Sequence, residues 1–176
     1  NCLRAHYPFP EAALDECDRR GILVWGEVPI YCLAPKEGET GTAFSDPPTV
    51  GLATGMLGEM ILHSGHHPAV AFWSVGNECK TAHPEAAAFF KACVEAVRGL
   101  DPTRPVAYAS LYGAMGCMDG LADVTGVNEY WGWYDKLGPR YSEPPGAPAP
   151  DSLEAKELVA CLAKLSRAGK PVLLTE

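Results

Sequence analysis

The chain has 176 residues, of which 47% are hydrophobic and 20% charged, so it can bury a core and is not intrinsically disordered. Its net charge of −8 at pH 7 argues against nucleic acid or an anionic membrane surface as the main partner, because both favour lysine and arginine. The sequence has no apolar run of about 18 residues, so we expect no transmembrane segment.

Helical and strand patterns alternate along the chain. In chain order, the expected elements are a strand ending near residue 5, a helix over 10–21, a strand over 22–30, a helix over 49–65, a strand over 69–75, a helix over 84–101, strands over 104–110 and 123–130, a helix over 152–169 and a strand over 170–176. The helix over 84–101 has the clearest signals, because Pro84 lies in its first turn, Arg98 in its last turn and Gly99 just beyond. Loops rich in Gly or Pro separate several of these elements.

Apolar strands that alternate with helices predict a parallel sheet covered by helices, which is an α/β fold. Polar residues recur where the strands end: Arg4, His6, Glu27, Asn77, Glu78, Asn128, Tyr130 and Glu176. A (β/α)8 TIM barrel assembles its active site from such strand ends, whereas an open doubly wound sheet gathers ligand groups at one switch point. No G-x-G-x-x-G or Walker-type loop follows any strand, which disfavours the doubly wound, nucleotide-binding alternative. We therefore expect residues 1–176 to form a single partial TIM-barrel domain.

Two strands end on a glutamate, in "FWSVGNE" at Glu78 and "KPVLLTE" at Glu176. Hydrolysis of a glycosidic bond needs two carboxyl groups, one to protonate the leaving oxygen and one to attack the anomeric carbon or activate a water. Glutamates at the ends of different barrel strands can converge across the mouth of the barrel. The pair is therefore the leading candidate for a catalytic site.

Six motifs, which together span nearly the whole chain, resemble the barrel domain of family 2 glycoside hydrolases, the β-galactosidase and β-glucuronidase family. The motifs are "LRAHYP" (3–8), "CDRRGILVWGEVP" (17–29), "HHPAVAFWSVGNE" (66–78), "DPTRPV" (101–106), "NEYWGWY" (128–134) and "KPVLLTE" (170–176). The resemblance implies a retaining mechanism with Glu78 as the acid/base on the fourth strand and Glu176 as the nucleophile on the seventh. It further implies that Asn77, Arg4, His6, Tyr130 and Trp133 bind the substrate. Asn128 and Glu27, which also stand at strand ends, complete the expected substrate-binding set. For Glu27 a structural role outside the substrate contacts is the favoured alternative.

The resemblance also implies that the chain covers about strands 2 to 7 of the barrel, without the first and eighth strands or the flanking β-sandwich domains. The missing parts of the parent chain, a carbohydrate substrate and a second copy of the full-length enzyme are the expected partners, and no cofactor is expected. An arc of six strands leaves two unpaired edges. We therefore expect the isolated chain to be unstable or to aggregate, and to have little activity.

The substrate is left open between a β-D-galactoside and a β-D-glucuronide. One alternative is a related glycosidase that acts on β-mannosides or β-glucans. Another is a catalytically inactive barrel remnant that binds carbohydrate or is purely structural.

Histidine and cysteine patterns give weaker signals. His63 and His67 have the spacing of a helical metal site, but Ser64 and Gly65 break the helix between them, so we expect no metal. The seven cysteines include no C-x-x-C pair, which favours free thiols and a cytoplasmic location over a disulfide framework. Cys79 lies beside Glu78 but has no evident base partner, so it is not expected to be a nucleophile.

Overall fold

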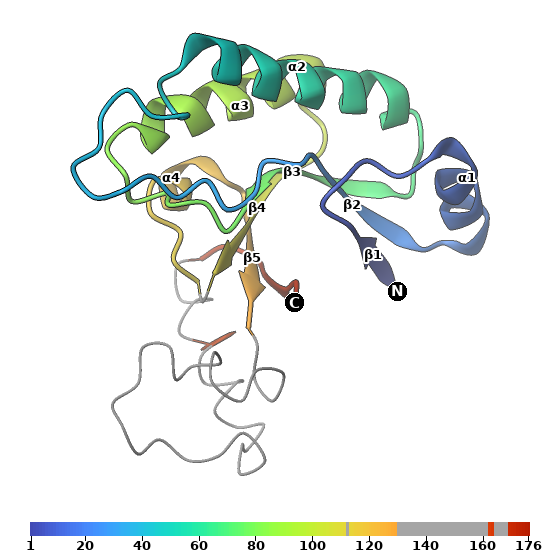
Figure 1. The fold of residues 1–176 in the computed structure, drawn as a ribbon. Coiled ribbons are helices and arrows are strands. Elements are labelled where there is room, and N and C mark those ends of the chain that lie inside the picture. The colour runs from blue at the N-terminus through green and yellow to red at the C-terminus, as the bar shows by residue number, and fades with distance from the viewer. Residues whose placement is uncertain (112, 130–161, 164–168) are drawn as a thin grey trace.

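The computed structural model describes residues 1–111, 113–129, 162–163 and 169–176 (Figure 1). In chain order its elements are β1 (Cys2–Arg4), α1 (Glu11–Arg20), β2 (Leu23–Glu27), α2 (Pro47–Ser64), β3 (Val70–Asn77), α3 (Ala86–Leu100), β4 (Val106–Leu111), α4 (Met118–Leu121), β5 (Val124–Asn128) and β6 (Val172–Leu174). The expected helices and strands agree with these bounds, apart from the helix over 152–169, nearly all of which lies outside the described residues. The short helix α4 was not expected. None of the described helices is long and apolar enough to cross a membrane.

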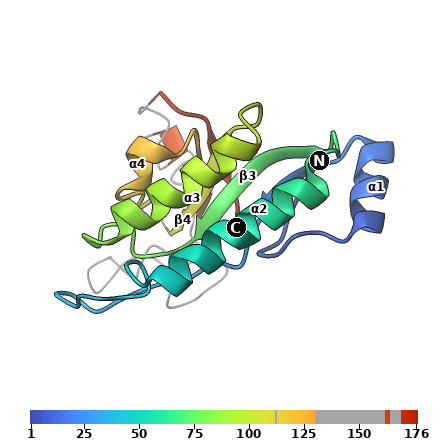
Figure 2. The same ribbon diagram turned by 90° about the horizontal axis from the view of Figure 1, so that it is seen from above.

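The described strands form one parallel sheet whose spatial order, β1-β2-β3-β4-β5-β6, is also the order along the chain. A doubly wound sheet reverses its strand order at the switch point, and this sheet does not. The helices α2 and α3 run side by side across one face of the sheet, and α1 lies at the β1–β2 end (Figures 1 and 2). The α/β fold with an arc of barrel strands is thereby confirmed.

The sheet is strongly curved. In a flat sheet, five strand spacings of about 4.8 Å would hold β1 and β6 roughly 24 Å apart. Instead, Arg4 at the end of β1 contacts Glu176 just after β6, with an Nη1–Oε1 distance of 2.8 Å. Trp25 of β2 likewise reaches Gly126 of β5 across two intervening strands, so that a Cβ on Gly126 would lie 2.9 Å from the indole. The carboxyl ends of distant strands are therefore brought to one place.

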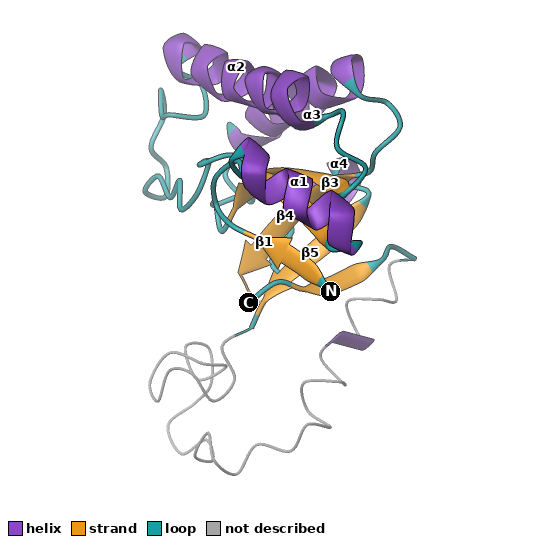
Figure 3. Ribbon diagram, turned by 90° about the vertical axis from the view of Figure 1, so that its right-hand side faces the viewer, coloured by secondary structure: helices purple, strands orange, loops and turns teal. Residues whose placement is uncertain are grey.

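Helices lie over one face of the sheet (Figure 3), and the main core is formed by side chains from these helices and from the strands. Phe89, Phe90 and Val97 form the buried stripe of α3, and Leu57 of α2 packs into the same cluster. Each such side chain contributes about 1.5–3 kcal/mol when it is fully buried. Trp25 belongs to a second, smaller cluster on the opposite face of the sheet. Apolar packing on both faces holds the strand ends that carry the polar residues.

Candidate active site

Seven of the expected site residues lie together at the carboxyl ends of the strands and are joined by hydrogen bonds and ion pairs. They are Arg4, His6, Glu27, Asn77, Glu78, Asn128 and Glu176. Tyr130 and Trp133, the other two, lie outside the described residues. The convergence follows from the parallel sheet, because all its strands end at the same edge.

Arg4 is the centre of this group. Its guanidinium binds Glu27 through two nitrogens, with Nε–Oε2 and Nη2–Oε1 distances of 3.1 Å each. It also donates to Glu176 Oε1 at 2.8 Å and to Asn77 Oδ1 at 2.7 Å. A planar guanidinium with five donors suits this task, since lysine could not hold three partners in fixed directions. Arg4 thus connects the ends of β1, β2, β3 and β6.

Glu27 is completely buried, at 0% exposure, beneath Arg4. Besides Arg4, its carboxylate accepts hydrogen bonds from Trp25 Nε1 at 2.8 Å and Ser74 Oγ at 2.9 Å. His6 Nδ1 lies 2.9 Å from the same carboxylate. Such a fully bonded buried anion holds its partners in fixed positions. Its burial favours the role of positioning Arg4 over contact with a sugar.

The chain turns sharply where β3 ends at Asn77. Glu78 has a φ of 49°, a left-handed conformation that is uncommon for residues other than glycine. The turn is fixed on both sides, because Glu78 N–H donates to Ala109 O at 2.9 Å and Cys79 N–H donates to Tyr108 Oη at 2.7 Å. Strained backbone that is held in this way is found preferentially at functional sites. Here it directs the Glu78 side chain towards the edge where the other strands end.

Asn128, at the end of β5, connects the two candidate catalytic strands. Its Nδ2 donates to Glu78 Oε1 at 2.7 Å and to Asn77 Oδ1 at 2.9 Å. Its Oδ1 accepts a hydrogen bond of 2.6 Å from Thr175 Oγ1, in the residue before Glu176. A single buried amide therefore sets the positions of Glu78 and of the end of β6 relative to each other.

The two candidate carboxylates have different partners. Glu176 Oε1 contacts the Arg4 cation at 2.8 Å, and His6 Nε2 lies 3.6 Å from the same oxygen. Glu78 Oε1 accepts a hydrogen bond from the neutral Asn128 amide. Two carboxyl groups in unlike environments can divide the roles of nucleophile and acid/base.

Several contributors were missed from sequence. Thr175, Trp25 and Ser74 bond to site residues, and Tyr31 stacks on His6 with ring centroids 5.8 Å apart. Tyr31 could have been noticed, because it follows the strand that carries Glu27. The three hydrogen-bond donors have no distinguishing pattern in a single sequence.

The cysteines behave as expected where they are described. Six of them are free thiols, and Cys161 lies outside the described residues. Burial raises the pKa of the Cys79 thiol to about 12. Cys79 is therefore protonated at neutral pH and is no nucleophile, although it adjoins Glu78.

Known proteins are similar to this chain in both sequence and fold. Residues 1–174 match the family model described as "Glycosyl hydrolases family 2, TIM barrel domain". The chain belongs to glycoside hydrolase family 2. Curated relatives include a β-glucuronidase from Paenibacillus borealis, 32% identical over 144 residues, and one from Rattus norvegicus, 34% identical over 142 residues. Each match covers 76% of this chain but only 23% and 20% of the relative, so the chain spans about a fifth to a quarter of these proteins.

Solved structures agree with the family 2 assignment. The β-D-glucuronidase of Dictyoglomus thermophilum superimposes with a TM-score of 0.77 and 28% identity, covering 99% of this chain and 29% of that one. A Bifidobacterium dentium β-glucuronidase complexed with coumarin-3-O-glucuronide gives a TM-score of 0.78 and 26% identity, covering 99% and 27%. The partial TIM barrel expected from sequence is thus confirmed.

Proposed function

We propose that the protein carrying this chain is a retaining glycoside hydrolase that cleaves terminal β-D-glucuronides. The observation that carries the proposal is the hydrogen-bonded group that holds Glu78 and Glu176 at one edge of the sheet through Arg4, Asn77 and Asn128. We propose glucuronides and not galactosides as the substrates, because the relatives and solved structures named above are β-glucuronidases.

In the first step, Glu176 attacks the anomeric carbon as a carboxylate while Glu78 donates its proton to the leaving oxygen. The bond from the anomeric carbon to the aglycone oxygen breaks as the ester bond to Glu176 forms. In the second step, Glu78 as a carboxylate takes a proton from water, which attacks the anomeric carbon and releases Glu176. The sugar leaves with its original β configuration.

The surrounding groups position these two carboxylates. Arg4 and His6 both contact Oε1 of Glu176, which fixes the orientation of the nucleophile. Asn77 directs its Oδ1 to Arg4 and Asn128, so its amide nitrogen is the donor assigned to the sugar 2-hydroxyl. A hydrogen bond to that hydroxyl strengthens in the transition state and so accelerates the reaction.

Two measurements on the full protein test the proposal. Proton NMR of the first product from an aryl β-D-glucuronide should show the β anomer, whereas an initial α anomer would contradict retention.

Glu78→Gln should lose roughly 10²–10⁴-fold in rate on an alkyl glucuronide, which needs the general acid. It should still react with 4-nitrophenyl β-D-glucuronide, whose leaving group needs no proton, and mass spectrometry should then find a glucuronosyl ester on Glu176.

Glu176→Gln is the matched control and should form no ester. Turnover of 4-nitrophenyl β-D-galactoside but not of the glucuronide would overturn the proposed substrate specificity. An absence of turnover on every β-glycoside would favour the inactive remnant.

A further inference from the structure

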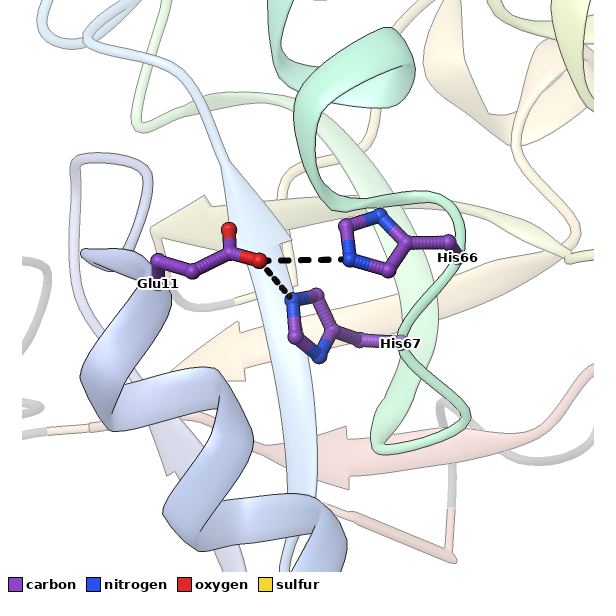
Figure 4. Close-up of side chains that lie close together, drawn as sticks. All are labelled: Glu11, His66 and His67. Atoms are coloured by element: carbon purple, nitrogen blue, oxygen red, sulfur yellow. Dashed lines mark hydrogen bonds and ion pairs between the residues drawn. The ribbon is translucent and has the colours of Figure 1, made fainter.

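A second cluster of ligand-type side chains lies away from the candidate active site, beside α1. Glu11 is the first residue of α1, and His66 and His67 lie in the connection between α2 and β3. The three side chains point towards one another from these two parts of the chain (Figure 4). His67 lies just before β3 and Asn77 ends it, and the eight residues of β3 span roughly 23 Å of extended strand, so the cluster is remote from the candidate catalytic carboxylates.

The geometry of the three groups suits one small cation. Glu11 Oε1 lies 3.3 Å from His66 Nε2 and 3.3 Å from His67 Nε2. One ligand atom from each of the three residues lies within 4.8 Å of the other two. Zinc holds nitrogen and carboxylate oxygen at about 2.0–2.2 Å in a tetrahedron, whose edges are then about 3.3 Å. The two observed separations match such an edge without rearrangement.

His67 gives the second, independent indication. Its side chain is only 2% exposed, and Asp18 Oδ2 lies 2.6 Å from its Nδ1. A proton on Nδ1 leaves Nε2 as a lone pair, which faces the lone pairs of the Glu11 carboxylate. Nε2 is buried and has no partner with hydrogen-bond geometry, although the Glu11 oxygen is 3.3 Å away. Two acceptors that face each other in this way call for a cation between them, which is either a metal ion or a second proton on His67, since Asp18 and Glu11 raise the pKa of that imidazole.

We propose that Glu11, His66 and His67 bind a divalent metal ion of the zinc type. Two imidazoles and one carboxylate are a zinc donor set that leaves a fourth position for water. Asp18 orients His67 as carboxylates behind metal-bound histidines commonly do. Asp18 also accepts from Ala69 N–H at 2.7 Å, which ties the same carboxylate to the residue before β3. The ion would link the start of α1 to the start of β3 and act on stability, not on the reaction.

The sequence-based expectation of no metal rested on the broken helical spacing of His63 and His67 and did not include Glu11. The helix α2 does end at Ser64, as the sequence indicates. However, His66 and His67 act from the segment after the helix, and their carboxylate partner comes from a residue 55 positions before His66. His63 contacts the other carboxylate oxygen, Glu11 Oε2, at 3.3 Å and is not one of the three ligands.

The test is a calorimetric titration of the full protein with ZnCl₂ after treatment with a chelator. It is done in a Cys2→Ser, Cys32→Ser background, because these two exposed thiols could bind zinc themselves. We expect one site per chain. Glu11→Gln and His66→Ala should each weaken zinc binding by about tenfold or more, since each removes one of three ligands. Both side chains are substantially exposed, at 47% and 62%, so these variants should fold, which circular dichroism would check.

Glu95→Gln on α3 is the control, because this carboxylate is also exposed and forms an ion pair with Lys91, far from the proposed site in the sequence. It should bind zinc as the parent does. Zinc should also raise the Tm of the parent and of Glu95→Gln but not that of His66→Ala, because only a ligand bound to the native state stabilises it. Unchanged affinity in both ligand variants would overturn the proposal. So would an absence of saturable binding at millimolar zinc, which would mean that a proton, not a metal, lies between His67 and Glu11.

Discussion

At the scale of single residues, the candidate site depends on side chains that bond to several strand ends at once. Arg4 contacts Glu27, Asn77 and Glu176, and Asn128 contacts Asn77 and Glu78. Asn77 therefore belongs to both sets of bonds and links the partner of Glu176, the proposed nucleophile, to the partner of Glu78, the proposed acid/base. A small displacement of any one strand end would reach the reacting atoms through these shared partners.

Arg4→Lys should lower kcat/KM on an aryl β-D-glucuronide by about 100-fold, because a misplacement of about 1 Å at a reacting group has that effect. Lysine keeps the charge but cannot bind Glu27 through two nitrogens while also reaching Asn77 and Glu176. Steady-state kinetics would measure the change. Arg19→Lys on the exposed face of α1 is the control, and equal kinetics for the two variants would contradict the role of Arg4.

The site residues that the sequence did predict share one property, which is that they stand where an apolar strand ends. The α/β pattern puts all such positions on one edge, so Asn77, Glu78 and Glu176 can be grouped from the order of residues alone. Thr175 and Ser74 cannot be grouped with them in this way. Their hydroxyls find Asn128 and Glu27 only because of the register and curvature of the sheet, which a single sequence does not encode locally.

At the scale of elements, Asp101 joins the end of α3 to β3 and to the segment before β4. Its carboxylate accepts from Trp73 Nε1 at 2.9 Å, from Arg104 Nη1 at 2.6 Å and from Thr103 N–H at 2.9 Å. Burial alone would raise the pKa of Asp101, but the bonds from Thr103, Trp73 and Arg104 outweigh it and hold the pKa well below its usual range. The ionised form therefore belongs to the folded state.

Asp101→Asn should lower the free energy of unfolding by roughly 2–3 kcal/mol at pH 7, because it removes charge-assisted bonds from partly buried donors. A carboxyl with a lowered folded-state pKa stabilises the fold above its unfolded value of about 3.9. This contribution is lost as the pH falls from there towards the lower folded-state pKa. Urea unfolding should therefore show a smaller difference at pH 3 than at pH 7. Asp15→Asn on exposed α1 is the control, and a difference that grows in acid would contradict the assignment.

The positions of the helices and strands were predictable because turn and cap signals are local. The curvature of the sheet was not predictable. Gly21 shows the local case, with a φ of 64° that ends α1 where the sequence indicates. Gly126 shows the other case. Nothing in "DVTGVNE" reveals that this glycine leaves room for the Trp25 indole from a strand three positions away in the sheet.

Gly126→Ala should destabilise the fold by about 1–3 kcal/mol, because the added Cβ would lie 2.9 Å from Trp25 and 3.1 Å from the Ala109 backbone. Gly55→Ala is the matched control in the exposed interior of α2, where a Cβ meets nothing within 4 Å. It should stabilise the fold by about 0.5–1 kcal/mol. Thermal unfolding of both variants would measure the contrast. A stable Gly126→Ala variant would mean that the sheet is less curved than described.

At the scale of the whole molecule, the described sheet is an open arc whose two outer strands are linked by side chains at their carboxyl ends. Arg4 and Glu176 bring the carboxyl ends of its two outer strands together, yet within the described residues β1 and β6 each pair with one neighbouring strand. Open strand edges offer unpaired backbone donors and acceptors to other chains. The edge strands β1 and β6 can therefore pair with strands of other chains.

We expect the 176-residue chain, when produced by itself, to self-associate as its concentration rises. Analytical ultracentrifugation over a range of concentrations would measure this. Lys substituted for the exposed Leu3 or Leu174 of the edge strands should reduce the association, because inward or edge charges oppose strand pairing. A monomer that unfolds reversibly and cooperatively at all concentrations would contradict the expectation.

The Arg4–Glu176 ion pair has a consequence for how the protein is made. Its partners are 172 residues apart, and a ribosome adds about 5–20 residues per second, so roughly 10–30 s separates their synthesis. Glu27 emerges soon after Arg4 and can pair with it early, and the strands then follow in the order in which they stand in the sheet. Among the described residues of the candidate site, Glu176 is made last. A nascent chain that has emerged only as far as β5 would already contain Arg4 and Glu78 but would still lack Glu176, the carboxylate proposed as the nucleophile.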